Sequence, residues 1–260
     1  NVPNLYSLSN TVNPLEAPSE SYSAKQVNGV YSNVNVGYKN FLFIDLTGRN
    51  DVSSTLSKGS NSYFYPSISG SYIFADHLKK LIGSNMKWLS YSKFRANYAQ
   101  VGSDAPYGST KNYYSAGTGF NGNAIYSVSS VMNSASLQPE KTKSREIGIE
   151  VSLLKNRVGF DINNYHAVTV DQIIPVDISR ATGYSQKFIN AGAILNRGIE
   201  MTLYLNPIRN KNFNWDINFN WARNRNKVLE LPDIENITLA NLQGGVSVNA
   251  TVGQAYGTIK

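Results

Sequence analysis

The feature that most constrains the fold is a strict two-residue alternation in NFNWDINFNWARNR, residues 212–225. Phe, Trp and Ile occupy the odd positions of residues 213–221, and Asn or Asp occupies the even positions between them. Successive side chains leave a β-strand on opposite faces, so this segment predicts a strand with one apolar and one polar face. A soluble sandwich would bury the apolar face in a core, whereas a membrane barrel would turn it towards lipid.

The same alternation recurs in pairs of segments that are joined by short connections. Residues 199–206 precede the strand at 212–225, and residues 147–153 precede residues 158–163. A third pair spans residues 34–46, and a less regular fourth pair joins residues 64–74 to 88–100 through a segment that can hold a helical turn. These pairs predict hairpins. The expected short turns lie near residues 38–41, 76–87, 155–157 and 207–211.

Long connections alternate with these short turns. They lie near residues 50–62, 102–143, 173–196 and 227–260. Short turns at one end of a sheet and long loops at the other are typical of an outer-membrane barrel, with the short turns in the periplasm. We therefore expect an all-β, antiparallel transmembrane β-barrel wall of about eight strands over residues 31–260. Residues 1–30 are expected to form an extracellular loop or a lead-in to the first strand.

Charge is distributed unequally between the two predicted strand faces. The apolar positions of residues 147–153, 158–163, 199–205 and 213–221 carry no Asp, Glu, Lys or Arg. A Lys or Arg at the middle of a bilayer costs about 2 to 4 kcal/mol, so lipid contact accounts for this exclusion, although a soluble core would also exclude charge. The residues predicted to face lipid are Ile147, Ile149, Phe160, Leu203, Trp215, Ile217 and Phe219. The residues predicted to face the lumen are Arg95, Asn97, Glu146, Glu150, Asp161, Glu200 and Asp216.

Composition argues against several other functions. The net charge is +7, but the basic residues are scattered and form no run, so we expect no nucleic-acid partner. The chain has no cysteine, its two histidines are isolated, and no G-x-S-x-G motif occurs. Glu146 and Glu150 would stand roughly 13 Å apart on a strand, which exceeds the spacing used in glycoside hydrolysis. We therefore expect no catalytic residue, metal ligand or cofactor.

The loop at residues 102–143 is the best candidate for contact with a ligand. It combines aromatic residues with Gly, Ser and Asn, and aromatic planes beside amide groups suit sugar rings or peptide groups. The alternative is that these rings only pack the loop. The candidate contact residues are Tyr107, Tyr113, Tyr114, Phe120 and Tyr126.

A family resemblance enters at SLQPEKTKSREIGIEVSLLKNRVGFDINNY, residues 136–165. This stretch resembles the barrel of SusC/RagA-type TonB-dependent outer-membrane transporters, in which an LxPExTxSxEiGiE segment leads into a strand and a short periplasmic turn. Further matches follow the same order, including FYPSISGSYIF, WLSYSKFRANYAQVG and VGQAYGTIK. One departure is Asn164, where the family often has a tyrosine.

The resemblance implies a 22-stranded, plugged barrel of which this chain is an internal part, with the plug and the TonB box outside it. It also implies import of an oligosaccharide or peptide across the outer membrane, with a SusD-like surface lipoprotein and TonB as partners. Two alternatives stay open. The barrel could be a non-transporting subunit of a larger envelope complex, or the chain could be a soluble or surface carbohydrate-binding β-protein.

Overall fold

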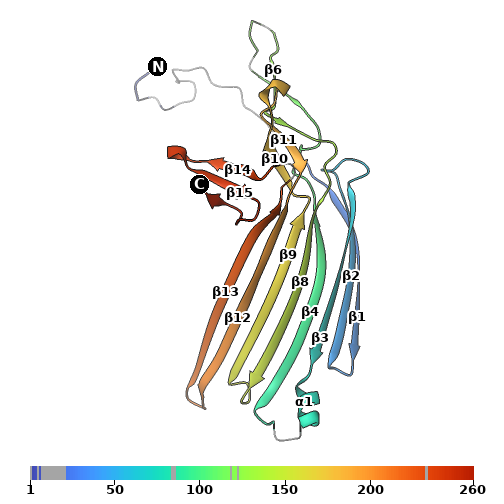
Figure 1. The fold of residues 1–260 in the computed structure, drawn as a ribbon, viewed down its shortest axis with the longest axis vertical. Coiled ribbons are helices and arrows are strands. Elements are labelled where there is room, and N and C mark those ends of the chain that lie inside the picture. Colours follow the sequence, from blue (N-terminus) through green and yellow to red (C-terminus); the bar gives the residue numbers. More distant parts are fainter. Residues whose placement is uncertain are drawn as a thin grey trace.

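The computed structural model describes residues 2–4, 6, 22–82, 86–117, 119–121, 123–231 and 234–260. Its main feature is one antiparallel sheet of eight long strands that lie side by side in chain order (Figure 1). The strands are β1 (Val27–Tyr38), β2 (Leu42–Ser53), β3 (Ser62–Ile73), β4 (Leu89–Ser103), β8 (Glu140–Leu153), β9 (Val158–Val170), β12 (Ala193–Arg209) and β13 (Asn214–Glu230).

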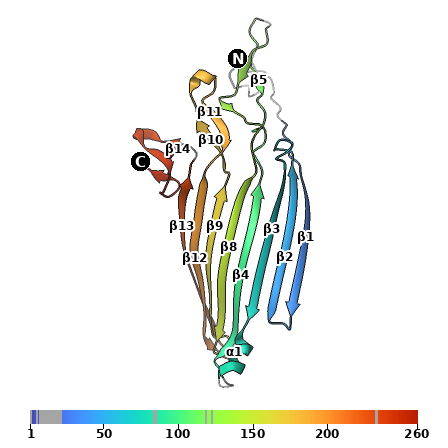
Figure 2. The same ribbon diagram turned by 45° about the vertical axis from the view of Figure 1, so that its right-hand side comes forward.

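This single curved layer argues against a sandwich. A sandwich divides its strands between two packed sheets, whereas here each long strand pairs with the next along the chain and the layer bends as a wall (Figure 2). The predicted all-β antiparallel barrel topology is confirmed. Among the described residues, no helix is both long enough and apolar enough to cross a membrane.

The two ends of the sheet differ. We call the end with the short connections the turn end and the opposite end, which carries the long connections, the loop end (Figure 1). At the turn end, Lys39 and Asn40 join β1 to β2 with φ angles of 46° and 57°, and Lys155 and Asn156 lie between β8 and β9 with φ angles of 59° and 61°. Asn adopts this left-handed conformation more readily than most residues, which favours such tight turns.

The third short turn lies later in the chain than the sequence indicated. We expected it near residues 207–211, but β12 continues through Pro207 to Arg209, and the turn occupies residues 210–213. The ladder between β12 and β13 shifts register between Leu205 and Ile208. Pro has no N–H for the ladder, and a bulge is one of the few places where a strand accommodates it.

A short helix closes the fourth connection at the turn end. Helix α1 (Ala75–Ile82) lies between β3 and β4, where a helical turn was expected. The ring of His77 contacts Phe41 edge-on, with 4.3 Å between centroids, and its Nδ1 lies 2.9 Å from the Tyr72 hydroxyl. His77 is thus a packing residue that fixes the helix on the sheet.

Pairing register defines the two faces of the wall, because directly opposite residues of antiparallel strands point to the same side. Glu150 lies opposite Lys93 and Asp161, and we call their side the polar face. Ile149 lies opposite Phe94, and their side is the apolar face.

Smaller elements gather at the loop end. They are β5 (Tyr114–Ala116), β6 (Tyr126–Val128), β7 (Val131–Met132), β10 (Ile173–Asp177), η2 (Arg180–Thr182), β11 (Gln186–Asn190), β14 (Asn236–Asn241), η3 (Gln243–Gly245), β15 (Ser247–Thr251) and β16 (Thr258–Ile259). One buried cluster of the described residues contains Leu56, Tyr63, Ala105 and Leu137, and a second contains Val228, Ile237 and Ala250. Of the expected lead-in at 1–30, residues 1, 5 and 7–21 lie outside the described residues, and β1 already begins at Val27.

Candidate functional site

A charged network lies on the polar face towards the turn end, since Glu150 and Asp161 each lie three residues from the strand end at the turn between β8 and β9. The guanidinium of Arg95 donates two hydrogen bonds to Asp161, with N···O distances of 2.6 and 3.0 Å, and Glu150 lies 4.0 Å from it. Gly148 lies opposite Arg95 in the ladder, and a Cβ at Gly148 would stand 2.7 Å from Arg95 Nε. The glycine therefore leaves the space in which Arg95 crosses from β4 over β8 to β9.

Other predicted lumen residues form smaller polar groups. Asn97 donates to Glu146 over 3.3 Å, and Asp216 accepts hydrogen bonds from Tyr204 and Asn206 over 2.7 and 2.6 Å. Glu200 lies opposite Asn163 on the same face, without an ion pair to any residue that the structure describes. The polar face is therefore largely satisfied by contacts within itself.

The residues predicted to face lipid share the opposite side. The register places Ile149 opposite Ile162, Phe160 opposite Leu203, and Leu203 opposite Phe219. Ile147, Trp215 and Ile217 have the same parity. Asn164 also lies on this face, where its amide donates to the carbonyl of Gly198 over 3.3 Å. The division of the strands into two faces is thus a property of the structure, whereas contact with lipid or lumen stays a prediction.

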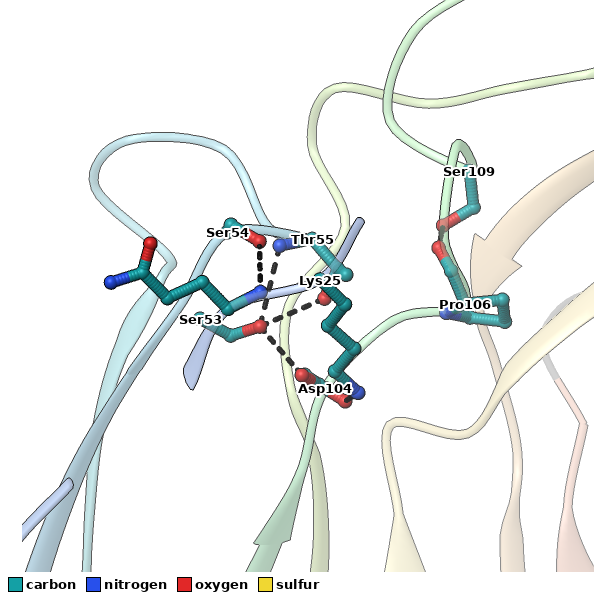
Figure 3. Close-up of polar contacts among 8 residues, drawn as sticks. Lys25, Ser53, Ser54, Thr55, Asp104, Pro106 and Ser109 are labelled. Carbon is teal, nitrogen blue, oxygen red and sulfur yellow. Dashed lines mark hydrogen bonds and ion pairs between the residues drawn. The ribbon is translucent and has the colours of Figure 1, made fainter. Parts of the chain in front are cut away.

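At the loop end, one carboxylate ties three segments together (Figure 3). Asp104 lies directly after β4. Its carboxylate forms a 2.6 Å ion pair with Lys25 in the lead-in and accepts a 2.5 Å hydrogen bond from the hydroxyl of Ser53 at the end of β2. The Ser53 hydroxyl also lies 2.9 Å from that of Thr55. Burial raises the pKa of Asp104, but the hydrogen bonds from Lys25 and Ser53 lower it by more, so the pKa lies below its ordinary value.

A second set of contacts fixes the far side of the same loop. The side chain of Asn190 accepts from the backbone N–H of Gln138 over 2.7 Å and donates to the carbonyls of Gln138 and Asp171 over 2.8 Å. Leu137 is 1% exposed in the first buried cluster, against which Phe188 packs. Both ends of the connection between β4 and β8 are therefore anchored.

The five candidate contact residues belong to the connection between these two sets of anchors, Asp104 and Gln138. Strands β5 and β6 form a hairpin in which Tyr114 and Tyr126 share one face, because Tyr114 pairs with Val128 and Ala116 with Tyr126. Tyr114 is 75% exposed and Tyr126 64%, and Phe120 lies between the two strands near the tip of the hairpin. The hairpin therefore exposes aromatic rings to solvent.

Tyr107 and Tyr113 precede β5 and are not part of the paired strands of this hairpin. Together with Phe188 they line an open pocket of about 520 Å³ at its foot. The structure thus separates the five residues into a hairpin group of three and a pocket group of two.

The anchoring residues Lys25, Ser53 and Asp104 were not singled out from the sequence. Ser53 and Asp104 stand 51 positions apart and Lys25 and Asp104 79 positions apart, and each is an ordinary polar residue near a strand end. Only the sheet order brings them together. Arg49, Asp51 and Tyr65, which form a neighbouring polar group on β2 and β3, were missed for the same reason.

An open eight-stranded meander with one apolar face, one self-paired polar face and long interlocked loops at one end defines part of the wall of a large membrane-type β-barrel. Residues 2–254 match the family model described as TonB dependent receptor-like, beta-barrel, and the chain belongs to this family of outer-membrane barrels. The resemblance to SusC/RagA-type proteins is thereby confirmed.

Individual relatives agree with this assignment. The chain is 30% identical to TonB-dependent receptor P26 of Formosa agariphila over 244 residues, which cover 91% of this chain and 24% of that protein. It is 29% identical over 153 residues to TonB-dependent receptor SusC of Bacteroides thetaiotaomicron, covering 58% of this chain and 13% of SusC. A solved structure of the RagAB peptide transporter has the same fold, with a TM-score of 0.78, 22% identity, and coverage of 88% of this chain and 25% of that one. The chain spans about a quarter of the length of P26.

Proposed function

We propose that this chain forms wall and surface loops of a SusC-like TonB-dependent importer in the outer membrane. The family match supports this role, and relatives carry the names SusC and TonB-dependent receptor. The transported nutrient is an oligosaccharide or a peptide, and the similarity to the RagAB peptide transporter favours a peptide. The partners are a SusD-like surface lipoprotein and TonB, which acts through a region outside this chain. The proposal assigns no enzymatic step to the chain.

In the membrane orientation that this function requires, the polar face lines the lumen and the apolar face meets lipid. The Arg95 network supports the assignment, because a wet lumen tolerates charges that pair with one another. Trp215 precedes Ile217 and Phe219 on the apolar face, on the side of the turn end, as an interfacial aromatic residue borders the lipid-facing band of a barrel. The loop end then lies outside the cell.

The observation that carries the proposal is the exposed aromatic face of the β5–β6 hairpin between anchored loop ends. Tyr114 and Tyr126 offer flat apolar surface with a polar tip, which suits a sugar ring or a peptide group, and a lipoprotein lid would meet the same rings. The anchors at Asp104 and Asn190 hold the base of this loop, so little conformational freedom has to be lost when a ligand binds.

The test replaces the aromatic side chains in the full-length protein. In Tyr114→Ala/Tyr126→Ala, uptake of labelled peptide and oligosaccharide pools by cells should fall about tenfold, since each ring contact contributes about 0.5 to 1.5 kcal/mol. The matched control is Ser115→Ala/Ser127→Ala, because these serines lie opposite each other on the other face of the same hairpin. Equal uptake by both double variants, with unchanged co-purification of the lipoprotein, would remove the hairpin from the proposed function.

A further inference from the structure

The apolar face carries basic side chains at one level on four adjacent strands. Towards the loop end, β8 and β13 each carry three Lys or Arg residues with the apolar parity, whereas β9 and β12 carry one basic residue each, His166 and Arg197, followed by Val168 and Leu195. We call these residues the basic patch: Lys141, Lys143, Arg145, His166, Arg197, Arg223, Arg225 and Lys227.

Register aligns four members of the patch in one row. Arg145 lies opposite His166, and Arg197 lies opposite both His166 and Arg225. Neighbouring strands are about 4.8 Å apart, so the row extends about 14 Å across the sheet. The four side chains line a shallow pocket of about 560 Å³ whose remaining walls include Ile147 and Ile199.

The patch has no compensating acid within the part of the chain that the structure describes. None of its side chains takes part in an ion pair or a side-chain hydrogen bond there. Of the acids nearest in sequence, Glu140, Glu146 and Glu200 have the parity of the polar face. Glu230 lies opposite Ala193 on the apolar face, beyond Lys227 at the end of β13, and forms no ion pair with the patch among the described residues. Arg197 and Arg225 form a directly opposed like-charge pair, which is destabilising in a sheet unless an anion lies between them.

The level of the patch coincides with the edge of the lipid-facing band. Ten residues separate Trp215 from Arg225, which at about 3.4 Å per residue and a tilt of about 40° correspond to a height of roughly 26 Å. The apolar band of such barrels is about 25 Å tall. The basic patch therefore lies where the headgroups of the outer leaflet begin, and its long side chains can reach them while their stems cover apolar surface.

We propose that the basic patch binds phosphate-bearing lipid headgroups of the outer leaflet. Guanidinium groups bind phosphate oxygens through paired hydrogen bonds, and three of the four residues in the row are arginines. The basic row ends at β8. The residue opposite Arg145 on the next strand, β4, is Tyr98, and the residue opposite Tyr98 on β3 is Ile68. This inference rests on the membrane orientation in the proposed function.

The test measures lipid retention by the full-length protein purified in dodecyl maltoside. The probes are lipid A and the same lipid with its phosphates removed, and bound lipid is counted by native mass spectrometry. The wild-type protein should retain the phosphorylated probe at least tenfold better, and Arg145→Gln/Arg197→Gln/Arg225→Gln should lose this preference. The control Lys155→Gln/Arg157→Gln/Lys211→Gln removes the same charge at the turn end and should keep it.

Three outcomes would overturn the proposal. The triple variant could keep the preference, the wild-type protein could show none, or the triple variant could lose self-association without any change in lipid retention, which would assign the patch to a second copy. Failure of the proposed function is recognised separately, because a protein that does not insert into phosphatidylethanolamine vesicles is no membrane wall. If the protein inserts into vesicles but does not prefer the phosphorylated lipid, only the proposal that the basic patch binds phosphate headgroups is refuted.

Discussion

Lysine at Ile217 and at the adjacent Asn218 tests which face of the wall meets lipid. The two residues lie at nearly the same depth on β13 and point to opposite faces, with Ile217 opposite Leu205 and Asn218 opposite Tyr204. In the proposed orientation, Trp215 lies at the membrane interface on the side of the turn end. Ile217 is two residues further along the strand, which for a tilt of about 40° places it about 5 Å deeper in the membrane than Trp215. A charge costs about 2 to 4 kcal/mol at the midplane and up to about 1 near the interface.

From this depth we expect Ile217→Lys to destabilise the folded barrel by about 2 kcal/mol, a roughly 30-fold shift in the folding equilibrium. Asn218→Lys should change it by less than about 0.5 kcal/mol, because the lumen hydrates the new charge. The assay is the denaturant midpoint of the full-length protein refolded into lipid vesicles, supported by the fraction that migrates as folded barrel in unheated gels. Equal effects at the two positions, or a larger effect at Asn218, would refute the lipid-facing assignment.

Three further predictions concern the polar contacts. Gly148→Ala should destabilise the protein by about 1 to 3 kcal/mol, because the new Cβ would displace both Asn163 and Arg95, and Arg95→Ala should relieve only the part of that loss that comes from Arg95; denaturant midpoints measure both. The Arg95–Asp161 pair should give a coupling of about 1 kcal/mol in a double-mutant cycle with Arg95→Gln and Asp161→Asn, and no coupling would mean that solvent screens the contact. The pKa of Asp104 is depressed, so its stabilisation is complete above the unfolded value and is lost as the pH falls through the folded one. The protection factors of residues 104–139 against hydrogen exchange, relative to the intrinsic exchange rate at each pH, should therefore fall below about pH 4 in the wild type, and Asp104→Asn should remove this pH dependence.

Much of the wall follows from the sequence because period-two alternation is a local signal. The alternation around Ile149 and Ile217 predicts both the strand and the side of each residue, and the register of the structure places them on one face. The strand ends are less predictable. Residues 222–230 of β13 continue the strand after the apolar alternation has stopped at Trp221.

That difference at the strand ends has a functional consequence. The apolar positions of residues 147–153, 158–163, 199–205 and 213–221 carry no charge, but the strands continue beyond them and bring Arg145, Arg197 and Arg225 onto the same face. The sequence alone predicts on which face of its strand each arginine lies, but not its height along the sheet. Only the pairing of β8, β9, β12 and β13 places the three arginines at one level. The anchors around Asp104 were invisible for a related reason, because contacts across 51 or 79 residues depend on the sheet order.

Strands β12 and β13 are longer than a bilayer requires. Each has 17 residues, which at about 3.4 Å per residue and a tilt of about 40° gives a height of about 44 Å, against an apolar band of about 25 Å. In the proposed orientation, a stiff collar of hydrogen-bonded sheet therefore stands above the membrane beneath the loops. An antibody or a phage adhesin that reaches past the loop tips would meet a rigid epitope there, and changes in loop sequence would leave that epitope intact.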